Sequence, residues 1–362
     1  MAIWPYLSIK LEVKELRKLA TLALVAVLFL SVIMAGCIGG TSTSTGTSSA
    51  SPTQTSSAQT TYSGTITIYT GGTSGVYYPL GSKYAELLNK AGIKAKAVTS
   101  GASVSNAKAI GDGNAQAAIM QNDVAYYAYN GLYMFQGDPI KNLRGVAALY
   151  PETVQFVVRA SSDIKSLQDL AGKKVAIGAP GSGTAVAAEQ ILKAAGVWDK
   201  IQKVNQDFSQ AAQALKLGQI DAAVIVSGAP TPAITQIAVT TPVRVIPISD
   251  DVLNKLKSEG YIFYVRQVLP KDTYKGMTED TPTLAVKAIL VVSASLPDDV
   301  VYEMTKVLFD NVDALRAVHQ KARYISLDTA LDGMSIPLHP GAYKYYEEKG
   351  ITVPDKIKPP SG

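Results

Sequence analysis

Cysteine and histidine are almost absent from this sequence of 362 residues, which contains one cysteine and two histidines. Because Cys37 has no partner cysteine, burial of a hydrophobic core must stabilise the folded part without disulfides. His319 and His339 alone provide too little material for a zinc site or a Ser-His-Asp triad. The glycine-rich loop that ends at Gly183 continues with Thr184, where a nucleotide-binding loop would have lysine. We therefore expect neither catalytic residues nor a metal or cofactor.

Concentrated positive charge and late hydrophobic runs are also missing. The net charge is only +5, and Lys and Arg form no basic tract, so the sequence offers no surface for nucleic acid. After residue 36, no apolar run is long enough to span a membrane. These features predict a soluble body with no nucleic-acid partner.

The first 36 residues have the pattern of a signal peptide. Basic residues are confined to residues 1–18, and residues 19–36 carry no charge. Small residues precede the cysteine in Met34-Ala35-Gly36-Cys37, which resembles a lipobox and implies that Cys37 is lipidated. The alternative is an uncleaved membrane anchor, for which the uncharged stretch is at the short edge of spanning length. Both interpretations place the rest of the chain on the extracytoplasmic face of the cell membrane.

Residues 37–63 consist mainly of Thr, Ser, Gly, Ala and Gln, a composition that predicts a lipid-anchored Ser/Thr-rich linker. The fold is expected to begin near Gly64. An alternating β-branched stretch at 66–70 predicts a strand, followed by a glycine-rich loop and a helix that begins near Pro79. Glycines let a ligand approach the backbone, and the N–H groups at a helix start favour an anion.

The pattern of this stretch returns later in the chain. Each half contains a strand, a glycine-rich loop, a helix, a short strand, a capped helix and a buried strand that ends at a polar residue. Parallel α/β units bind ligands beyond the carboxyl ends of their strands, so both halves are expected to face one cleft. The alternative is that such loops and caps occur in any α/β protein and that the matching spacing is accidental. The recurring positions are Gly71, Ser103 and Gln121 in the first half, and Gly178, Ser209 and Ser227 in the second.

These halves predict an α/β fold of two lobes. Lobe I is expected to comprise residues 64–155 and 270–362, and lobe II residues 156–269. The boundaries lie where strands are expected to pass from one lobe to the other.

Two strands are expected to connect the lobes. The apolar stretch 154–159 predicts the strand that enters lobe II, and 261–268 predicts the strand that returns. An apolar strand at 284–293 and an amphipathic helix at 298–311 would complete lobe I.

Four side chains have a functional and a structural interpretation. Asp123 can hold a ligand ammonium group or cap the helix that begins at Val124. Arg159 can meet a ligand carboxylate, although a solvated position beside Asp163 is favoured. His339 is expected to form a structural hydrogen bond at a bend rather than to take part in catalysis. Tyr77, inside the glycine-rich loop, is the tyrosine expected to line a ligand cleft.

Five motifs of the folded part occur together. They are Thr70-Gly71-Gly72-Thr73-Ser74-Gly75-Val76-Tyr77-Tyr78-Pro79-Leu80-Gly81, Gly101-Ala102-Ser103-Val104-Ser105-Asn106, Gln121-Asn122-Asp123-Val124-Ala125-Tyr126, Gly178-Ala179-Pro180-Gly181-Ser182-Gly183-Thr184 and Ile336-Pro337-Leu338-His339-Pro340-Gly341-Ala342-Tyr343-Lys344-Tyr345-Tyr346. With these motifs, residues 64–354 resemble the TAXI solute receptors of TRAP transporters. One departure is Ala102, which stands where the family often has glycine.

The resemblance implies a periplasmic-binding-protein type II fold, with two lobes, each a mostly parallel sheet flanked by helices, and a hinge between them. It implies capture of a small organic anion or amino acid, glutamate-like, in the cleft and delivery to an ion-gradient-driven TRAP permease. An ABC-type substrate-binding lipoprotein is the alternative in the same class. An α/β enzyme acting on small acids and a structural surface lipoprotein are alternatives of other classes.

The expected partners are the small-molecule ligand, a TRAP-type permease and the membrane through the lipid anchor. The candidate ligand-binding residues combine the glycine-rich loops, the expected helix caps and the strand ends. They are Gly72, Thr73, Ser74, Gly75, Tyr77, Ser103, Asn106, Gln121, Asp123, Ser182, Gly183, Thr184 and Ser227.

Overall fold

The computed structural model describes residues 62–360. The predicted signal peptide, the lipidation site Cys37 and nearly all of the predicted linker lie outside the described residues. The described residues cluster as one unit. Within the described range, no helix is long and apolar enough to cross a membrane.

Helices and strands alternate along most of the described chain. The helices are α2 (Tyr77–Lys90), α3 (Ser103–Gly111), α4 (Asn122–Asn130), α5 (Gly183–Ala194), α6 (Phe208–Lys216), α7 (Pro232–Ala238), α8 (Asp250–Ser258), α9 (Asp298–Asp310), α10 (Val312–Arg316) and α11 (Pro340–Glu348). The strands are β1 (Ile66–Tyr69), β2 (Ala95–Val98), β3 (Ala117–Gln121), β4 (Leu143–Arg159), β5 (Lys174–Ala176), β6 (Gln202–Val204), β7 (Ala222–Ser227), β8 (Val243–Ile246), β9 (Val265–Leu269) and β10 (Thr281–Ser293).

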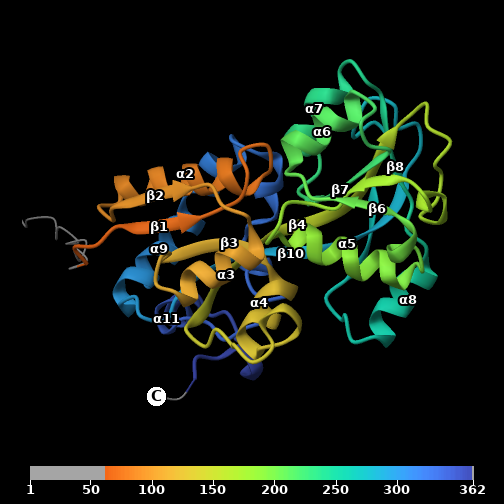
Figure 1. The fold of residues 1–362 in the computed structure, drawn as a ribbon. Coiled ribbons are helices and arrows are strands. Elements are labelled where there is room, and N and C mark those ends of the chain that lie inside the picture. Colours follow the sequence, from red (N-terminus) through yellow and green to blue (C-terminus); the bar gives the residue numbers. More distant parts are fainter. Residues whose placement is uncertain (1–61, 361–362) are drawn as a thin grey trace, which may run out of the picture. The chain divides into compact units, whose positions relative to one another are not determined.

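The strands form one mixed sheet in the order β2-β1-β3-β10-β4-β7-β5-β6, with β8 on β4 and β9 on β10 (Figure 1). At one end, β1 pairs in parallel with β2 and β3, and β10 runs antiparallel to β3. At the other end, β5 pairs in parallel with β6 and β7, and β4 runs antiparallel to β7. The repeat expected from the sequence is therefore a repeat of sheet topology.

Separate hydrophobic cores define two lobes. Except for Val186, the core of lobe I is built from residues 66–150 and 288–357. Lobe II has a core on each face of its sheet, one packed against α5 and α8 and the other against α6 and α7 (Figure 1). The expected α/β fold, with two lobes of mostly parallel strands flanked by helices, is confirmed.

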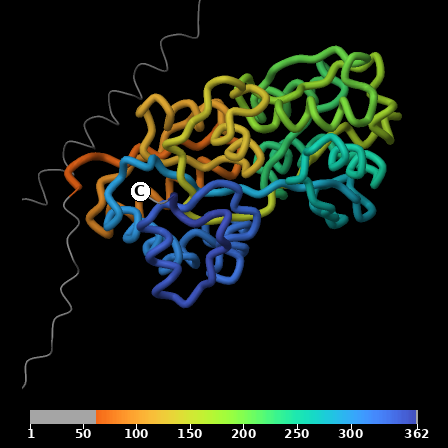
Figure 2. Tube along the Cα trace, turned by 90° about the horizontal axis from the view of Figure 1, so that it is seen from below, coloured from red at the N-terminus to blue at the C-terminus, as the bar shows by residue number. Residues whose placement is uncertain are grey.

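The lobes are joined by two adjacent strands, β4 and β10, which run antiparallel to each other. Strand β4 pairs with β10 in lobe I and continues from Thr153 along β7 in lobe II. Strand β10 begins against β9 and ends against β3. Figure 2 shows these two segments joining the lobes from another side. The prediction that a strand at 261–268 returns to lobe I is therefore wrong. That stretch contributes only to β9, and β10 is the strand that returns to lobe I.

The cores also show where the return lies along the chain. Tyr274 and Met277 pack in one core of lobe II, and Leu284 and Val286 pack in the other. We propose the lobe division of the sequence analysis with its return boundary near residue 287 instead of 270.

Candidate functional site

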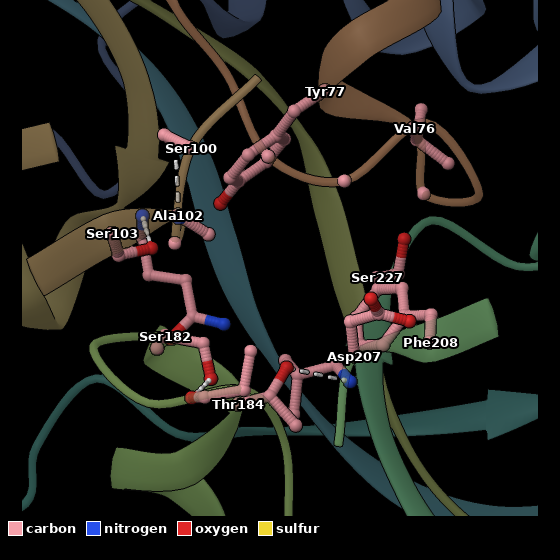
Figure 3. Close-up of a pocket in the computed structure, with 18 of the residues that line it drawn as sticks. Val76, Tyr77, Ser100, Ala102, Ser103, Ser182, Thr184, Asp207, Phe208 and Ser227 are labelled. Carbon is pink, nitrogen blue, oxygen red and sulfur yellow. Dashed lines mark hydrogen bonds between the residues drawn. The ribbon is translucent and has the colours of Figure 1, made fainter. Parts of the chain in front are cut away.

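A cavity of about 450 Å³ lies between the two lobes. Its walls are the loops that follow β1 and β2 in lobe I, the loops that follow β5 and β6 in lobe II, the last residues of β3 and β7, and Glu152 of β4. These loops lie at the carboxyl ends of parallel strands, where α/β folds bind ligands. In Figure 3, Tyr77, Ser100 and Ser103 face Ser182, Thr184 and Asp207 across the cavity. The volume lies in the range of small-molecule sites.

Most of the residues predicted for the site line this cavity, and Ser74, Asn106 and Asp123 do not. Asn106 instead donates hydrogen bonds from Nδ2 to the carbonyls of Thr70 (2.7 Å) and Ile119 (2.8 Å), so it ties the ends of β1 and β3 together. Those that line the cavity are Gly72, Thr73, Gly75, Tyr77, Ser103, Gln121, Ser182, Gly183, Thr184 and Ser227.

Helix α2 begins at the cavity without a side-chain cap. Its N-cap residue is Val76, and its first residue is Tyr77, two positions before the expected start at Pro79. The first N–H groups of a helix have no acceptor within the helix. In α2 these are the N–H groups of Tyr77 and Tyr78, because Pro79 has none, and they remain available to an anion at the cavity.

Helix α5 presents a second start to the cavity. Ser182 is its N-cap, with Oγ accepting from the N–H of Ala185 (3.1 Å) and donating to the carbonyl of Ala179 (2.7 Å). The bond to Ala179 uses the one hydroxyl hydrogen of Ser182 within the loop. The N–H groups of Gly183 and Thr184, by contrast, have no acceptor within the helix.

Helix α6 is capped by Asp207, and not by Ser209 as the spacing predicted. Asp207 accepts from the N–H of Gln210 (2.8 Å), and the Gln210 side chain accepts from the N–H of Asp207 (3.1 Å), which forms a capping box. The cap lies earlier because β6 ends at Val204, so the helix begins at Phe208. Asp207 and Phe208 consequently line the cavity, and Ser209 does not.

Helix α3 is capped by the opposite lobe. Its N-cap is Ala102, whose φ of 67° is a strained value for alanine, and the predicted cap Ser103 is its first helical residue. The N–H groups of Val104 (3.0 Å) and Ser105 (3.1 Å) donate to the carbonyl of Gly181 in lobe II. The two lobes are thus in direct hydrogen-bonded contact beside the cavity.

Two hydroxyl groups of the cavity wall retain a hydrogen for a ligand. Ser103 Oγ accepts from the N–H of Gln121 (3.1 Å), and Thr184 Oγ1 accepts from the N–H of Val226 (3.3 Å). A hydroxyl that accepts still has its own O–H to donate. Ser103 and Thr184 therefore offer donors from opposite lobes.

Glu152 is a buried carboxyl group in the cavity wall, 2 % exposed. Tyr77 Oη donates to its Oε2 at 2.6 Å. Burial, and to a smaller extent the nearby Asp123 carboxyl, raise the pKa of Glu152 to about 8 despite this bond. Burial also raises the pKa of Tyr77 well above its ordinary value, so Tyr77 is the donor in the pair.

Asp123 is fully buried in the first turn of α4 and does not line the cavity. Neither of its carboxyl oxygens has a hydrogen-bond partner in the described part of the chain. Burial raises its pKa to about 7, and the N–H groups of Val124 and Asp123 itself lower the pKa only in part. The structure thus shows neither a hydrogen-bonded cap nor a direct place in the cavity for Asp123.

The remaining candidates lie away from the cavity. Arg159 donates from Nη1 to the carbonyl of Leu215 (3.3 Å) and lines a separate surface pocket with Asp163. His339 is fully buried, with Nδ1 accepting from the N–H of Gly341 (3.2 Å) and Nε2 at 3.1 Å from the carbonyl of Leu296. The expected structural role of His339 is confirmed.

Glu152 and Phe208 line the cavity and were not predicted from the sequence. A carboxylate within the apolar stretch 145–158 was a detectable signal, but Pro151 made that stretch resemble a loop followed by a short strand. Phe208 was not predicted, because the expected helix cap was Ser209. A phenylalanine at the start of a helix also belongs to no recognisable motif.

Fold and site define a class: a two-lobed α/β protein of the periplasmic-binding-protein fold with a ligand-sized cavity between its lobes. The family model described as NMT1-like family matches residues 68–350. The chain therefore belongs to the NMT1-like family.

Several solved structures are similar at low identity. The periplasmic aliphatic sulphonate binding protein SsuA from Escherichia coli has a TM-score of 0.43 and 18 % identity, with 78 % of this chain and 82 % of that chain covered. A putative L-cystine ABC transporter from Listeria monocytogenes has a TM-score of 0.45 and 16 % identity, with 74 % and 98 % covered. The arginine-bound, truncated ArgBP from T. maritima has a TM-score of 0.42 and 14 % identity, with 68 % and 95 % covered. The ligand in each of these names is the ligand of that similar protein.

Proposed function

We propose that this protein is an extracytoplasmic solute receptor that captures a small organic anion or amino acid between its lobes. It delivers this ligand to a TRAP-type permease driven by an ion gradient, as the TAXI-like motifs imply. In this proposal the chain is not an enzyme, and Cys37 carries the lipid that anchors it to the extracytoplasmic face of the membrane.

One observation carries the proposal: a cavity of about 450 Å³ that both lobes line with helix starts and hydroxyl groups. The uncapped start of α2 and the start of α5 provide backbone donors for a carboxylate. Ser103 and Thr184 add hydroxyl donors from the two lobes. The two connecting strands let the lobes separate and close, so ligand binding can favour the closed arrangement.

A thermal-shift screen of residues 64–362 against amino acids and small carboxylates tests the proposal. A ligand at one hundred times its Kd adds about 2.7 kcal/mol to the free energy of unfolding, which raises Tm by several degrees. Tyr77→Ala should weaken the hit at least tenfold, because it removes one wall of the cavity and the donor to Glu152. Ser258→Ala, an exposed change on α8, is the control. If no compound raises Tm, the proposal fails and a structural lipoprotein is favoured.

Two alternatives give different results. An ABC-type receptor would bind the same ligands but support uptake only with an ATP-driven permease, so reconstitution with each permease type separates the two. An enzyme acting on small acids would convert the hit on long incubation. Recovery of the compound unchanged supports a receptor.

A further inference from the structure

Glu152 stands out because an apolar connecting strand places a carboxyl group in the cavity wall. It lies on β4 between Pro151 and Thr153, opposite Val286 on β10. Tyr77 Oη donates to Glu152 Oε2 at 2.6 Å. This bond leaves Oε1 free to accept from a ligand. Burying a carboxyl group with a single hydrogen-bond donor costs free energy. A second donor from a ligand would reduce this cost.

The titratable groups that face Glu152 are a carboxyl group and two phenols, and none of them is a cation. Asp123 approaches from α4, Tyr77 from α2, and Tyr150 lies two residues away on β4. The nearby Lys321 does not line the cavity, and burial lowers its pKa. No Lys or Arg occurs among the described residues that line the cavity.

A second acceptor lies in the same wall. Gln121 ends β3, pairs with Ala288 on β10 and lines the cavity. Its Oε1 is buried without a donor among the described residues. Glu152 and Gln121 thus lie on the strands on either side of β10, and Gln121 Oε1 lies beside Gly183 of lobe II.

We propose that Glu152, with Gln121, forms the subsite for the ammonium group of an α-amino acid, while the ligand carboxylate binds at the starts of α2 and α5. The inference rests on the proposed function and narrows its ligand class. An ammonium group supplies three donors and a positive charge to Glu152 Oε1 and Gln121 Oε1, beside which the cavity wall has no cation. Dicarboxylates and 2-oxo acids carry no such group, so the cavity selects amino acids over them.

Proton exchange gives the subsite a distinctive signature. The positive ligand favours the ionised form of Glu152, whose pKa in the free protein is raised. Binding near pH 7 therefore releases a proton, and affinity increases as the pH approaches 8. A protonated Glu152 that donated to a ligand carboxylate would instead take up a proton on binding and lose affinity as the pH rises.

Titration calorimetry with matched ligand pairs tests the subsite. The probes are L-glutamate with 2-oxoglutarate and L-leucine with 4-methyl-2-oxopentanoate, each in two buffers of different ionisation enthalpy. For the preferred pair, we expect the amino acid to bind at least tenfold more tightly than its 2-oxo counterpart and to release a proton at pH 7. Glu152→Gln should weaken amino-acid binding tenfold to a hundredfold, abolish the proton release and leave the 2-oxo acid within threefold. Glu259→Gln, an exposed change of the same chemistry, should alter nothing.

Tyr77→Phe distinguishes the charge of Glu152 from a structural role. It removes the hydrogen bond that lowers the pKa of Glu152, so the pH at which amino-acid affinity rises should move upward. Raising the pH should therefore restore binding to Tyr77→Phe but not to Glu152→Gln. This readout also holds if Glu152→Gln fails to fold.

The outcomes separate the two proposals. Equal affinity for amino acid and 2-oxo acid, proton uptake on binding, or equal weakening of both ligands by Glu152→Gln overturns the ammonium subsite while the receptor function stands. Absence of binding by any amino acid or carboxylate overturns both.

Discussion

At the scale of single residues, the hydroxyl groups of the cavity divide into those already used by the fold and those free to donate. Ser182 belongs to the first kind, because its Oγ caps α5 and donates to Ala179. Ser103 and Thr184 belong to the second kind. Residue type and position in a motif did not reveal this difference, because it depends on where each hydroxyl hydrogen points.

We predict that Ser182→Ala lowers the free energy of unfolding by about 1 kcal/mol through loss of the helix cap. Ligand affinity should change less than about threefold, since the helix-start N–H groups remain. Urea unfolding and titration calorimetry measure the two effects. Ser249→Ala is a matched control, because Ser249 is the N-cap of α8 without a side-chain cap hydrogen bond. Equal destabilisation by both changes would contradict the assigned role of Ser182.

The two buried carboxyl groups predict how stability depends on pH. The pKa of Asp123 rises from 3.8 to about 7, and that of Glu152 from 4.5 to about 8. Between these values Asp123 and Glu152 bind more protons in the folded state than in the unfolded state, so their contribution to stability is greatest at low pH and falls as the pH rises toward 8. The contribution is on the order of a few kcal/mol.

We predict that Asp123→Asn flattens this decline between pH 4 and 7, because it removes one of the two titrating groups. The free energy of unfolding from urea titrations at each pH is the measurement. Asp163→Asn, an exposed substitution, should leave the slope unchanged. An Asp123→Asn protein with the wild-type slope would show that Asp123 is ionised in the fold.

At the scale of elements, contact between the lobes depends on glycine at the start of α5. The carbonyl of Gly181 accepts from two N–H groups of α3, and its φ is +76°. A Cβ at Gly181 would overlap Ser105 Oγ of lobe I, and a Cβ at Gly183 would overlap Gln121 Oε1. Side chains at these positions would therefore hold the lobes apart.

Gly181→Ala and Gly196→Ala form a matched pair. Both glycines have positive φ, 76° and 70°, so both substitutions should cost about 1 kcal/mol of stability. Only Gly181 faces the other lobe, because nothing lies within 4 Å of a Cβ at Gly196. We predict that Gly181→Ala alone weakens ligand binding at least tenfold by calorimetry. Similar ligand affinities for the two variants would show that the contact between the lobes does not contribute to ligand binding.

The sequence predicted the elements best where local chemistry decided them. The strands before the two glycine-rich loops and the buried strands ending at Gln121 and Ser227 follow from apolar runs and glycine punctuation. The helix caps at Ser103 and Ser209 were wrong, since the Gly181 carbonyl caps α3 from the other lobe and Asp207 caps α6. A cap supplied by another lobe leaves no local signal.

The connecting strands were only half predicted for a similar reason. The second half of β4 and most of β10 are apolar runs, but pairing between distant strands decides which run crosses between the lobes. Pro151 obscured the first half of β4 and with it Glu152. The cavity position of Glu152 depends on the register of β4 against β10, which the sequence does not encode locally.

At the scale of the whole molecule, the hydrogen bonds between the lobes report closure. Val104 and Ser105 donate to Gly181, and Ala233 at the start of α7 donates to the carbonyl of Ser74 (3.2 Å). These bonds join a helix start in one lobe to a loop in the other, whereas the bonds between β4 and β10 are internal to the sheet that connects the lobes. Ligand-dependent closure should therefore change the first set and leave the second set unchanged.

We predict that ligand slows amide hydrogen exchange at Val104, Ser105 and Ala233 at least tenfold, because these N–H groups contact water whenever the lobes separate. The amides of Leu290 and Val291 in β10 should be protected equally with and without ligand, since they lie in the core of lobe I. Exchange measured by NMR or mass spectrometry on residues 64–362 with the best hit from the thermal-shift screen gives both sets together. In Gly181→Ala, the ligand should no longer protect Val104 and Ser105. Protection of these amides without ligand would mean that the lobes stay closed, and ligand entry would then require a different motion.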